Sequence, residues 1–348
     1  MNPGLSLESG PKTKRTNLKD LSSYLGLSQT TISFVLNDAP LAKKLTQETR
    51  QRVLDAARKL HYRPSYFAVN LNKSGSESVG VLVPDHGEGY FAVVMGAVER
   101  CLLQRDYVYF TACHHRQPKL MREYPQLLMK RGAEGLLLLE TDANFVTPLP
   151  VVTLCSHKPR EGVTNIGVDH GAAARLVIRH LYDRGHRKIA FMRGRRKVSD
   201  ATYRWEATMQ VARDFGVQPT PERIVQLGSS EWSPEMGYEP TKRLLQVTQD
   251  FSALVCVHDW AAVGAIRALQ EEGIDVPRDV SVVGFDDIVG AAFHTPRLTT
   301  IRQPLRRMGQ LAATILLDRI AQPEREYAGT VLVKPELIVR ESTGPAAV

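Results

Sequence analysis

The N-terminal part of this chain contains the run Gly26-Leu-Ser-Gln-Thr-Thr-Ile-Ser-Phe-Val-Leu-Asn37, from which its local fold can be predicted. Immediately before it, residues 18–25 read as one helix, with Asn17 placed as its N-cap. Gly26 then breaks that helix, as the tight turn between two crossing helices requires. The stretch therefore predicts a helix, a turn and a second helix.

The second helix of this stretch has one apolar and one polar face. Ser28 is placed to cap it. The apolar side chains recur at the spacing of one buried face: Ile32, Val35 and Leu36. The opposite face presents mostly short polar side chains: Gln29, Thr30, Ser33, Phe34 and Asn37. Such a helix suits the major groove of DNA, and we interpret the pair as a helix-turn-helix.

The segment that follows supports this interpretation. A glycine between two amphipathic helices is also common in proteins that bind no DNA, so the motif alone leaves both readings open. Residues 46–60 predict a third helix, capped by Thr46. Its predicted buried stripe is Val53, Ala56, Ala57 and Leu60. His61-Tyr-Arg-Pro64 ends it, because the residue before a proline avoids the helical region, and residues 65–73 are too short to form a stable helix alone.

Several motifs of this N-terminal part resemble those of a known family. They are Leu18-Lys-Asp-Leu21, Gly26-Leu-Ser-Gln-Thr-Thr-Ile-Ser33, Asn37, Thr49-Arg50, and Tyr62-Arg-Pro64 with Ala68 and Leu71. Together they resemble the headpiece of the lactose-repressor/purine-repressor (LacI/GalR) family. The resemblance implies that residues 65–73 form a hinge helix, ordered when two subunits meet on the operator. It also implies that Leu71 wedges between base steps in the minor groove.

The same resemblance implies a set of residues that contact double-stranded operator DNA. They are Leu18, Ser28, Gln29, Thr30, Thr31, Ser33, Phe34, Asn37, Tyr62, Ala68 and Leu71. Phe34 departs from the family, which usually has arginine there, the residue that reads guanine with two hydrogen bonds. A phenyl ring can pack on a thymine methyl group instead. Alternatively, Phe34 folds against Leu41 in the loop 38–44 and contacts no base.

Composition excludes several classes of protein. The chain has 348 residues, of which 43% are hydrophobic, and no apolar run approaches the length of a membrane span. Residues 1–14 lack the apolar core of a secretory signal, so we expect residues 1–16 to form a disordered tail. The four cysteines form no CxxC pair, which indicates reduced thiols in a cytoplasmic protein.

The positive charge is concentrated in the N-terminal part. Residues 1–77 contain twelve Lys and Arg but six Asp and Glu, whereas the rest of the chain is nearly neutral. A basic excess confined to the headpiece is typical of a protein that binds a polyanion. Residues 74–78 are small and polar and predict a linker, which separates a headpiece of residues 17–73 from the remaining chain.

From residue 79 onward, short apolar runs alternate with helical patterns. The predicted strands are 79–83, 107–112, 135–139, 151–154, 165–168, 188–192, 224–227, 253–257 and 280–285. The predicted helices are 92–104, 120–131, 171–184, 202–215, 235–246 and 261–272. Such alternation predicts parallel sheets covered by helices on both faces. The expected fold class is an α/β core of two Rossmann-like subdomains, similar to periplasmic binding proteins, preceded by a small all-α headpiece.

The core also resembles the family. The matching runs are 79–85, 184–190, 277–287, 296–304 and 337–343, the last as a closing strand, so that the resemblance extends from about Leu18 to Thr343. It implies that residues 79–343 bind an effector and form the dimer. Ligands of such folds lie beyond the carboxyl ends of the parallel strands. The residues implied to bind the effector are Tyr90, Phe91, Arg204, Trp232, His258 and Asp286.

These effector residues have specific expected roles and alternatives. Arg204 is expected to hydrogen-bond the effector from the first turn of a helix, Asp286 to bind its polar groups, and Trp232 to stack on it. Arg204 and Asp286 could instead form a structural ion pair. Phe91 could equally be a core residue.

Other polar groups have a plainer interpretation. The pair His114-His115 is expected to lie in a solvated loop, since neighbours on a strand point to opposite faces and make a poor metal site. Glu140 and Asp142 are also expected to be solvated. Cys155-Ser-His157 lacks the acid and the sharp turn of a nucleophilic site.

Arg193-Gly-Arg-Arg-Lys197 is an unusual run for the rim of the cleft. It is either a solvated patch or a site for an anionic effector such as a carboxylated or phosphorylated sugar. Asp200, where the family tends to have serine, argues against the second reading.

The sequence thus predicts a dimeric, sequence-specific transcriptional regulator, with repression as its mode. Its effector is expected to be a sugar, a sugar acid or a similar metabolite that shifts the orientation of the two core halves and thereby the DNA affinity. A free-standing solute-binding protein would lack the headpiece. An enzyme on this fold would need a nucleophile or a G-x-G-x-x-G turn, and the sequence has neither. No cofactor, metal ion or membrane partner is expected.

Overall fold

The computed structural model describes residues 16–62, 75–85, 89–156, 158, 160–195, 199–227 and 233–347. The chain divides into two compact units between Ser76 and Glu77. The expected tail and the expected hinge helix at residues 65–73 therefore lie outside the described residues.

The first unit is a small helical domain. Its elements are α1 (Leu18–Leu25), α2 (Gln29–Leu36), the 3-10 helix η1 (Pro40–Lys44) and α3 (Gln47–Lys59). The predicted caps of all three α-helices are confirmed, because the side chains of Asn17, Ser28 and Thr46 each accept a hydrogen bond from the backbone N–H three residues later. Gly26 has a φ of 66°, a left-handed conformation that glycine adopts without strain. The predicted turn between α1 and α2 is thus present.

Three helices enclose one apolar cluster in this unit. Leu21, Ile32 and Val53 are fully buried at its centre, one from each helix. Phe34, expected on the exposed face of α2, is instead partly buried against this cluster. A large aromatic ring beside an incomplete apolar core gains more from packing than from exposure to water.

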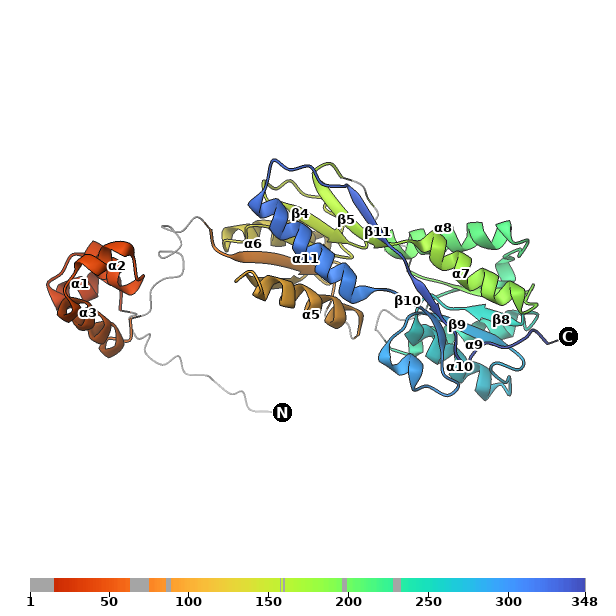
Figure 1. The fold of residues 1–348 in the computed structure, drawn as a ribbon. Helices are drawn as coiled ribbons and strands as arrows, with labels where there is room; N and C mark the ends of the chain where they lie inside the picture. The colour runs from red at the N-terminus through yellow and green to blue at the C-terminus, as the bar shows by residue number, and fades with distance from the viewer. Residues whose placement is uncertain are drawn as a thin grey trace, which may run out of the picture. The chain divides into compact units, whose positions relative to one another are not determined.

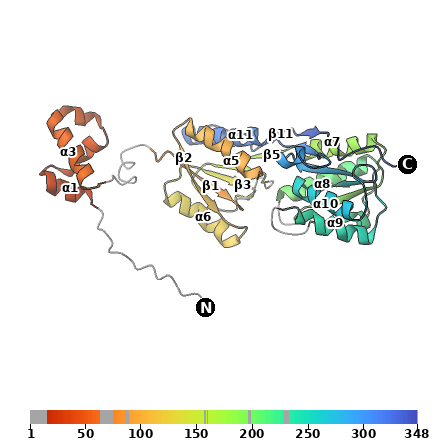
Figure 2. The same ribbon diagram turned by 90° about the horizontal axis from the view of Figure 1, so that it is seen from below.

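The second unit contains two lobes, each with a central six-stranded sheet. In the first lobe the strand order is β11-β5-β4-β3-β1-β2. These strands are β1 (Ser78–Val83), β2 (Val108–Cys113), β3 (Leu136–Leu139), β4 (Val151–Leu154), β5 (Val163–Val168) and β11 (Thr330–Val333), all paired in parallel. Figure 2 shows α5 (Tyr90–Leu103) and α11 (Leu305–Ala321) on one face of this sheet and α6 (Pro118–Lys130) on the other.

The second lobe repeats this plan with the strand order β12-β10-β9-β8-β6-β7. Its strands are β6 (Ile189–Arg193), β7 (Ile224–Gln226), β8 (Ala253–Val255), β9 (Ser281–Asp286), β10 (Thr299–Arg302) and β12 (Glu336–Ile338). Helices α7 (His170–Asp183) and α8 (Ser199–Asp214) cover one face, and α9 (Glu235–Val247) and α10 (Asp259–Glu271) the other (Figure 1). The short helices η2 (Pro221–Arg223) and η3 (Val289–Ala292) complete the lobe.

The C-terminal part of the chain belongs to both lobes. Strand β10 lies in the second sheet, α11 packs on α5 of the first lobe, β11 extends the first sheet, and β12 returns to the second (Figure 1). The sequence did not predict β10, α11 or β11. The expected closing strand 337–343 ends at Ile338, and β12 pairs antiparallel with β10, unlike the predicted parallel strands. The other predicted elements are confirmed, with ends that differ by at most three residues.

Among the described residues, no helix is both long enough and apolar enough to cross a membrane.

Candidate effector pocket and DNA-reading helix

The polar face of α2 lies open to solvent in the headpiece. Gln29, Thr30 and Asn37 are exposed. The Ser28 hydroxyl lies 2.8 Å from the Thr31 hydroxyl, and Asn37 Nδ2 donates to Ser33 Oγ at 3.1 Å. These hydrogen bonds hold short polar side chains in fixed orientations along one face, as contact with base edges and phosphates requires.

The other residues expected to contact DNA differ in their surroundings. Leu18 and Tyr62 are partly buried and pack against the headpiece cluster, as Phe34 does. Their apolar atoms thus have a structural role in the free protein. Ala68 and Leu71 lie outside the described residues.

A pocket lies between the two lobes of the second unit. Residues from loops that follow β2 and β3 line it from the first lobe, and residues around the ends of β6, β7 and β8 line it from the second. The lining residues are Arg116, Glu140, Gly194, Arg195, Asp200, Ala201, Arg204, Leu227, Met236, Val257 and His258. As predicted for this fold, the pocket lies at the carboxyl ends of parallel strands.

Arg204 is held on three sides. One terminal nitrogen donates to the Val257 carbonyl at 2.6 Å, and the other to Asp200 Oδ2 at 2.7 Å. Its guanidinium carbon lies 3.7 Å from the centre of the Phe285 ring. Arg204 lies in the second turn of α8, not the first as expected, because the helix begins at Ser199. The result is a planar cation fixed at the pocket wall.

Asp286 is the last residue of β9, and its Oδ1 accepts a hydrogen bond from Gln303 Nε2 at 2.6 Å. Burial raises the pKa of Asp286 well above its ordinary value, although Arg204 opposes the rise. The salt bridge of Arg204 is with Asp200, so the alternative of a direct Arg204–Asp286 ion pair is wrong. Asp286 does not line the pocket.

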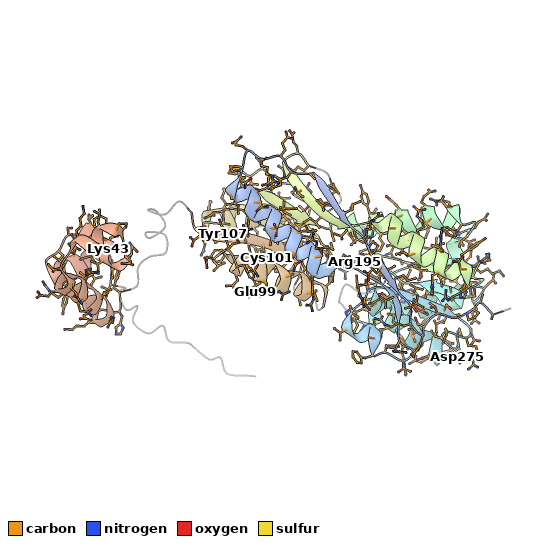
Figure 3. The ribbon with its side chains drawn as sticks, in the orientation of Figure 1. Lys43, Glu99, Cys101, Tyr107, Arg195 and Asp275 are labelled. Atoms are coloured by element: carbon orange, nitrogen blue, oxygen red, sulfur yellow. The ribbon has the colours of Figure 1, made fainter. Side chains whose placement is uncertain are left out.

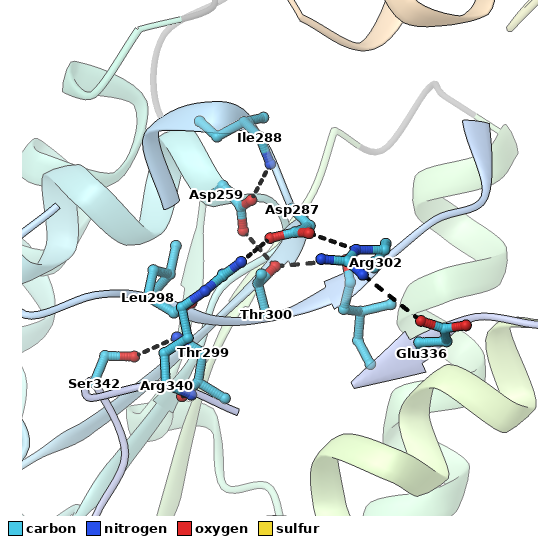
Figure 4. A network of polar contacts seen from close by, with 11 residues as sticks. Asp259, Asp287, Ile288, Leu298, Thr299, Thr300, Arg302, Glu336, Arg340 and Ser342 are labelled. Atoms are coloured by element: carbon cyan, nitrogen blue, oxygen red, sulfur yellow. Dashed lines mark hydrogen bonds and ion pairs between the residues drawn. The ribbon is translucent and has the colours of Figure 1, made fainter. Parts of the chain in front are cut away.

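A polar network supports the sheet next to Asp286 (Figure 4). The Asp287 carboxylate accepts hydrogen bonds of 2.6 Å from both Arg302 and Arg340. Buried Asp259 accepts from the Thr300 hydroxyl at 2.6 Å and from the backbone N–H of Ile288 at 2.8 Å. These bonds join β9, β10 and α10 and hold the strand end that carries Asp286.

His258 caps α10 with its side chain, since Nδ1 accepts from the N–H of Ala261 at 3.2 Å. Burial, together with Arg204 and Arg195, lowers the pKa of His258 to about 3, so the ring is neutral at pH 7.

The aromatic residues predicted to bind the effector differ in their surroundings. Tyr90 is partly buried, and its hydroxyl lies 3.1 Å from the sulfur of Cys155. Phe91 is a core residue of the first lobe, so the core alternative is the correct one for this residue. Trp232 lies outside the described residues.

Three polar residues that were expected to be solvated are buried or largely buried instead. Glu140 lines the pocket and pairs with Arg116 at 2.9 Å. Asp142 is also largely buried, pairing with Lys158 at 2.6 Å. His114 is buried, not solvated, because its Nε2 lies 2.8 Å from the hydroxyl of Thr141. In each case a partner distant in the sequence offsets the cost of burying the polar group, which the local pattern could not reveal.

The described part of the run at residues 193–197 divides between two environments. Arg193 ends β6 with its guanidinium over the ring of Trp205, at 5.2 Å from the ring centre. Arg195 is half-buried in the pocket.

Three further residues of the same pocket were not predicted as site residues: Arg116, Glu140 and Asp200. Their only sequence signal was their position just after predicted strands or at the start of a predicted helix. Among the described residues there is no group of three or more side chains suited to a metal ion.

Comparison with known proteins identifies the family. Residues 17–65 match the family of bacterial regulatory proteins called the lacI family, and residues 178–343 match a periplasmic binding protein-like domain. The chain is 31% identical over 335 residues to the HTH-type transcriptional repressor PurR of Pasteurella multocida. The alignment covers 93% of this chain and 98% of that protein. The chain belongs to the lacI family. This lacI-family member is therefore a DNA-binding transcriptional regulator and not an enzyme.

Other matches agree with this assignment. A PurR repressor of Serratia proteamaculans is 32% identical over 334 residues, covering 93% of this chain and 96% of that protein. A structure of the Lac repressor bound to ONPG in the repressed state is 26% identical, with a TM-score of 0.78 and coverage of 95% and 100%. A lacI-family regulator from Enterococcus faecium with bound ribose is also 26% identical, with a TM-score of 0.67 and coverage of 78% and 100%.

Proposed function

We propose that this lacI-family regulator is a repressor that binds an operator as a homodimer and responds to a sugar, a sugar acid or a similar small metabolite. The observation that carries the effector proposal is the pocket lined from both lobes by Arg116, Glu140, Arg195 and Arg204. Fixed guanidinium and carboxylate groups beside apolar walls suit a small molecule with many hydrogen-bonding groups. We place this effector in contact with Arg204 and His258, with Tyr90, Trp232 and Asp286 nearby.

The proposed mechanism couples the pocket to DNA. A ligand that contacts both lobes favours the orientation in which those contacts coexist. Because binding linkage is reciprocal, an effector that changes operator affinity must itself bind with a changed affinity in the presence of operator. The response is thus a property of the whole chain and needs no chemical reaction.

The segments of the chain have separate proposed roles. We assign residues 17–73 to operator binding, with Leu71 in the minor groove, and the predicted linker 74–78 to the connection, although its last residue, Ser78, already begins β1. We assign residues 79–343 to effector binding and dimerisation. Exposed apolar side chains are available on each lobe for contact with a second copy, among them Phe110 and Phe293. A regulator of bacterial DNA works in the cytoplasm, which is where we place this one.

The effector proposal is tested by a screen on the purified full-length protein. Sugars, sugar acids and nucleobases are added singly, and the midpoint of thermal unfolding is recorded, because a ligand that binds the folded state raises it. Compounds that raise the midpoint are then added to the protein bound to operator fragments selected from a random pool. We expect at least one compound to change operator affinity. A compound that stabilises the protein without any effect on DNA binding would contradict the proposed coupling.

The role of Phe34 is tested by its replacement with arginine. If Phe34 contacts DNA, it packs on a thymine methyl group, and the wild type selects a T·A pair where Phe34→Arg selects G·C. Operator selection from a random pool with both proteins measures this preference at every position. Unchanged preference at all positions would make Phe34 a purely structural residue, in line with its packing against the headpiece cluster.

A further inference from the structure

A second pocket lies between the two lobes, apart from the effector pocket. We propose that it binds a small neutral molecule with an aromatic ring and a carbonyl oxygen, such as an aromatic amide, and that this molecule modulates operator affinity. Among the described residues the two pockets share no lining residue. The residues of the second pocket that carry the argument are Asn165, Asp169, Tyr203, Ala207, Thr330 and Leu332.

The floor of the second pocket is a part of the first sheet that stays open to solvent. β5 and β11 are neighbouring parallel strands at one edge of this sheet, and Thr330 pairs with Asn165 (Figure 1). Leu332 of β11 is 55% exposed, whereas α6 packs against β1 towards the opposite edge. Tyr203 and Ala207 of α8 bound the space from the second lobe. The pocket has a volume of about 300 Å³, against about 50 Å³ for the effector pocket, which is enough for a small molecule.

Asn165 supplies a hydrogen-bond donor with a fixed direction. The residue is 7% exposed, and its Oδ1 accepts hydrogen bonds from the backbone N–H of Ser156 at 3.1 Å and from the Thr153 hydroxyl at 2.9 Å. Because a backbone N–H can only donate, these bonds identify the oxygen of the amide and direct Nδ2 away from them. Nδ2 donates to none of the described residues, yet it is not sealed inside the protein. The donor therefore faces the pocket, where an acceptor on a ligand would satisfy it.

The charges of the lining favour a neutral ligand. Of the described residues that line the pocket, none is lysine or arginine, and Asp169 is acidic. Asp169 caps α7, since its Oδ1 accepts from the N–H of Ala172 at 2.8 Å, so its carboxylate is fixed at this place. An anionic ligand would meet this carboxylate without a cationic partner from the lining.

The apolar walls favour a ring beside the carbonyl group. A water molecule would satisfy Asn165 Nδ2 but would gain nothing from the side chains of Leu332, Tyr203 and Ala207. Tyr203 is 47% exposed, so that it and Leu332 present apolar surface to solvent when the pocket is empty of ligand. An aromatic ring would cover this surface while its carbonyl oxygen accepts from Nδ2.

The position of the second pocket links it to DNA binding. A molecule in it contacts β5 and β11 of the first lobe and α8 of the second, so its affinity depends on the orientation of the lobes. His170 also lines the pocket, and its Nε2 lies 2.8 Å from Oδ1 of Asp200, which in turn holds Arg204 of the effector pocket. Binding here would thus change operator affinity, and reciprocally. This regulatory role rests on the proposed function, whereas the binding site itself does not.

The site is tested with benzamide as the probe and benzoate as its anionic counterpart of the same shape. Saturation-transfer NMR on the full-length protein measures both affinities. We expect saturable binding of benzamide, and binding of benzoate at least about tenfold weaker, because its charge meets Asp169. Asn165→Asp keeps the acceptor for Ser156 but loses the donor, and should bind benzamide about tenfold less tightly. Ala207→Leu should abolish binding, because it fills the pocket from α8.

Leu332→Ala and Leu103→Ala form a matched pair of variants. Both leucines are exposed in the first lobe, 55% and 72%, so neither change should unfold the protein. Leu332→Ala removes a wall and should weaken benzamide binding about fivefold. Leu103 lies at the end of α5, near Cys101 in Figure 3, and its replacement should leave the benzamide affinity unchanged.

Thermal unfolding without ligand verifies that each variant is folded. The site is refuted if the wild type shows no saturable binding of benzamide, or if benzoate binds equally well. Equal benzamide affinities of the wild type and folded Ala207→Leu, or of Leu332→Ala and Leu103→Ala, would also refute it.

The regulatory role is measured on operator fragments selected from a random pool. We expect saturating benzamide to change the operator dissociation constant of the wild type at least about fivefold, and Ala207→Leu to lose this response. Saturable binding of benzamide with unchanged operator affinity would support the site and refute its regulatory role. The benzamide titration does not depend on the outcome of the effector screen, so the two proposals can fail separately.

Discussion

Replacing Arg204 with alanine is expected to abolish the response of operator binding to the effector. Arg204 is the cation held between the Val257 carbonyl, Asp200 and the ring of Phe285, and it lines the pocket. Its loss removes the proposed contact with the effector and also leaves the buried Asp200 without its arginine, which costs about 3–5 kcal/mol of stability for a buried pair. Operator affinity measured with and without the effector found in the screen checks the first effect.

The stability cost requires two control variants. Arg204→Lys keeps the charge but loses the planar fork, and we expect a weakened response with most of the stability retained. Asp286→Asn should have little effect on stability, because the raised pKa of Asp286 favours its uncharged form and asparagine can still accept the Gln303 hydrogen bond. If Arg204→Ala is folded at the assay temperature, as judged by thermal unfolding, and responds as the wild type does, the effector site lies elsewhere.

For an effector that acts as an inducer, Arg204→Ala should leave the operator affinity without ligand unchanged. For a corepressor, the same variant should resemble the wild type in the absence of its ligand and should fail to gain affinity when the ligand is added. Both cases are distinguished by one pair of binding curves, since effector and operator act on each other's affinity through the same free energy.

A large loss of stability is also expected from Gly264→Ala. Gly264 of α10 faces α9, and a methyl group on it would lie 1.8 Å from the Pro234 carbonyl oxygen. A methyl group on Gly237 of α9 would likewise lie 1.9 Å from the carbonyl oxygen of Ala261 in α10. Backbone atoms cannot move aside as side-chain ends can, so the two helices must separate. We expect a destabilisation of about 3 kcal/mol or more, at the upper end of measured overpacking effects.

Gly96→Ala is the matched control for this prediction. Gly96 also lies within a helix, α5, but a methyl group there would meet only the end of Arg100, at 3.7 Å. Alanine should therefore stabilise the protein by about 0.5–1 kcal/mol, because it restricts the unfolded chain and favours the helix. Urea unfolding of both variants measures the difference in sign. Similar stability of Gly264→Ala and wild type would show that α9 and α10 can separate at little cost.

The sequence determined those features that depend on neighbouring residues. The caps at Asn17, Ser28 and Thr46, the turn at Gly26 and the alternation of strands and helices follow from local hydrogen bonding and from the periodicity of apolar residues. The position of the pocket beyond the strand ends follows from the rule for parallel sheets. The run at residues 193–197 belongs to that region because it directly follows the predicted strand 188–192, whereas Arg204 and His258 were assigned to it by the resemblance to the lacI family.

Which charged groups form pairs, and which residues are buried, depends on contacts between segments that are distant in the sequence. The pairing of Arg116 with Glu140 joins two groups that are 24 residues apart in the sequence. Phe34 of α2 is partly buried against the headpiece cluster, to which α1 and α3 also contribute residues. The C-terminal part of the chain adds strands to both sheets, and the partners of these strands are distant in the sequence. Thr330 of β11, for example, pairs with Asn165 of β5. Such contacts are selected by the free energy of the whole fold, and no short window of sequence contains both partners.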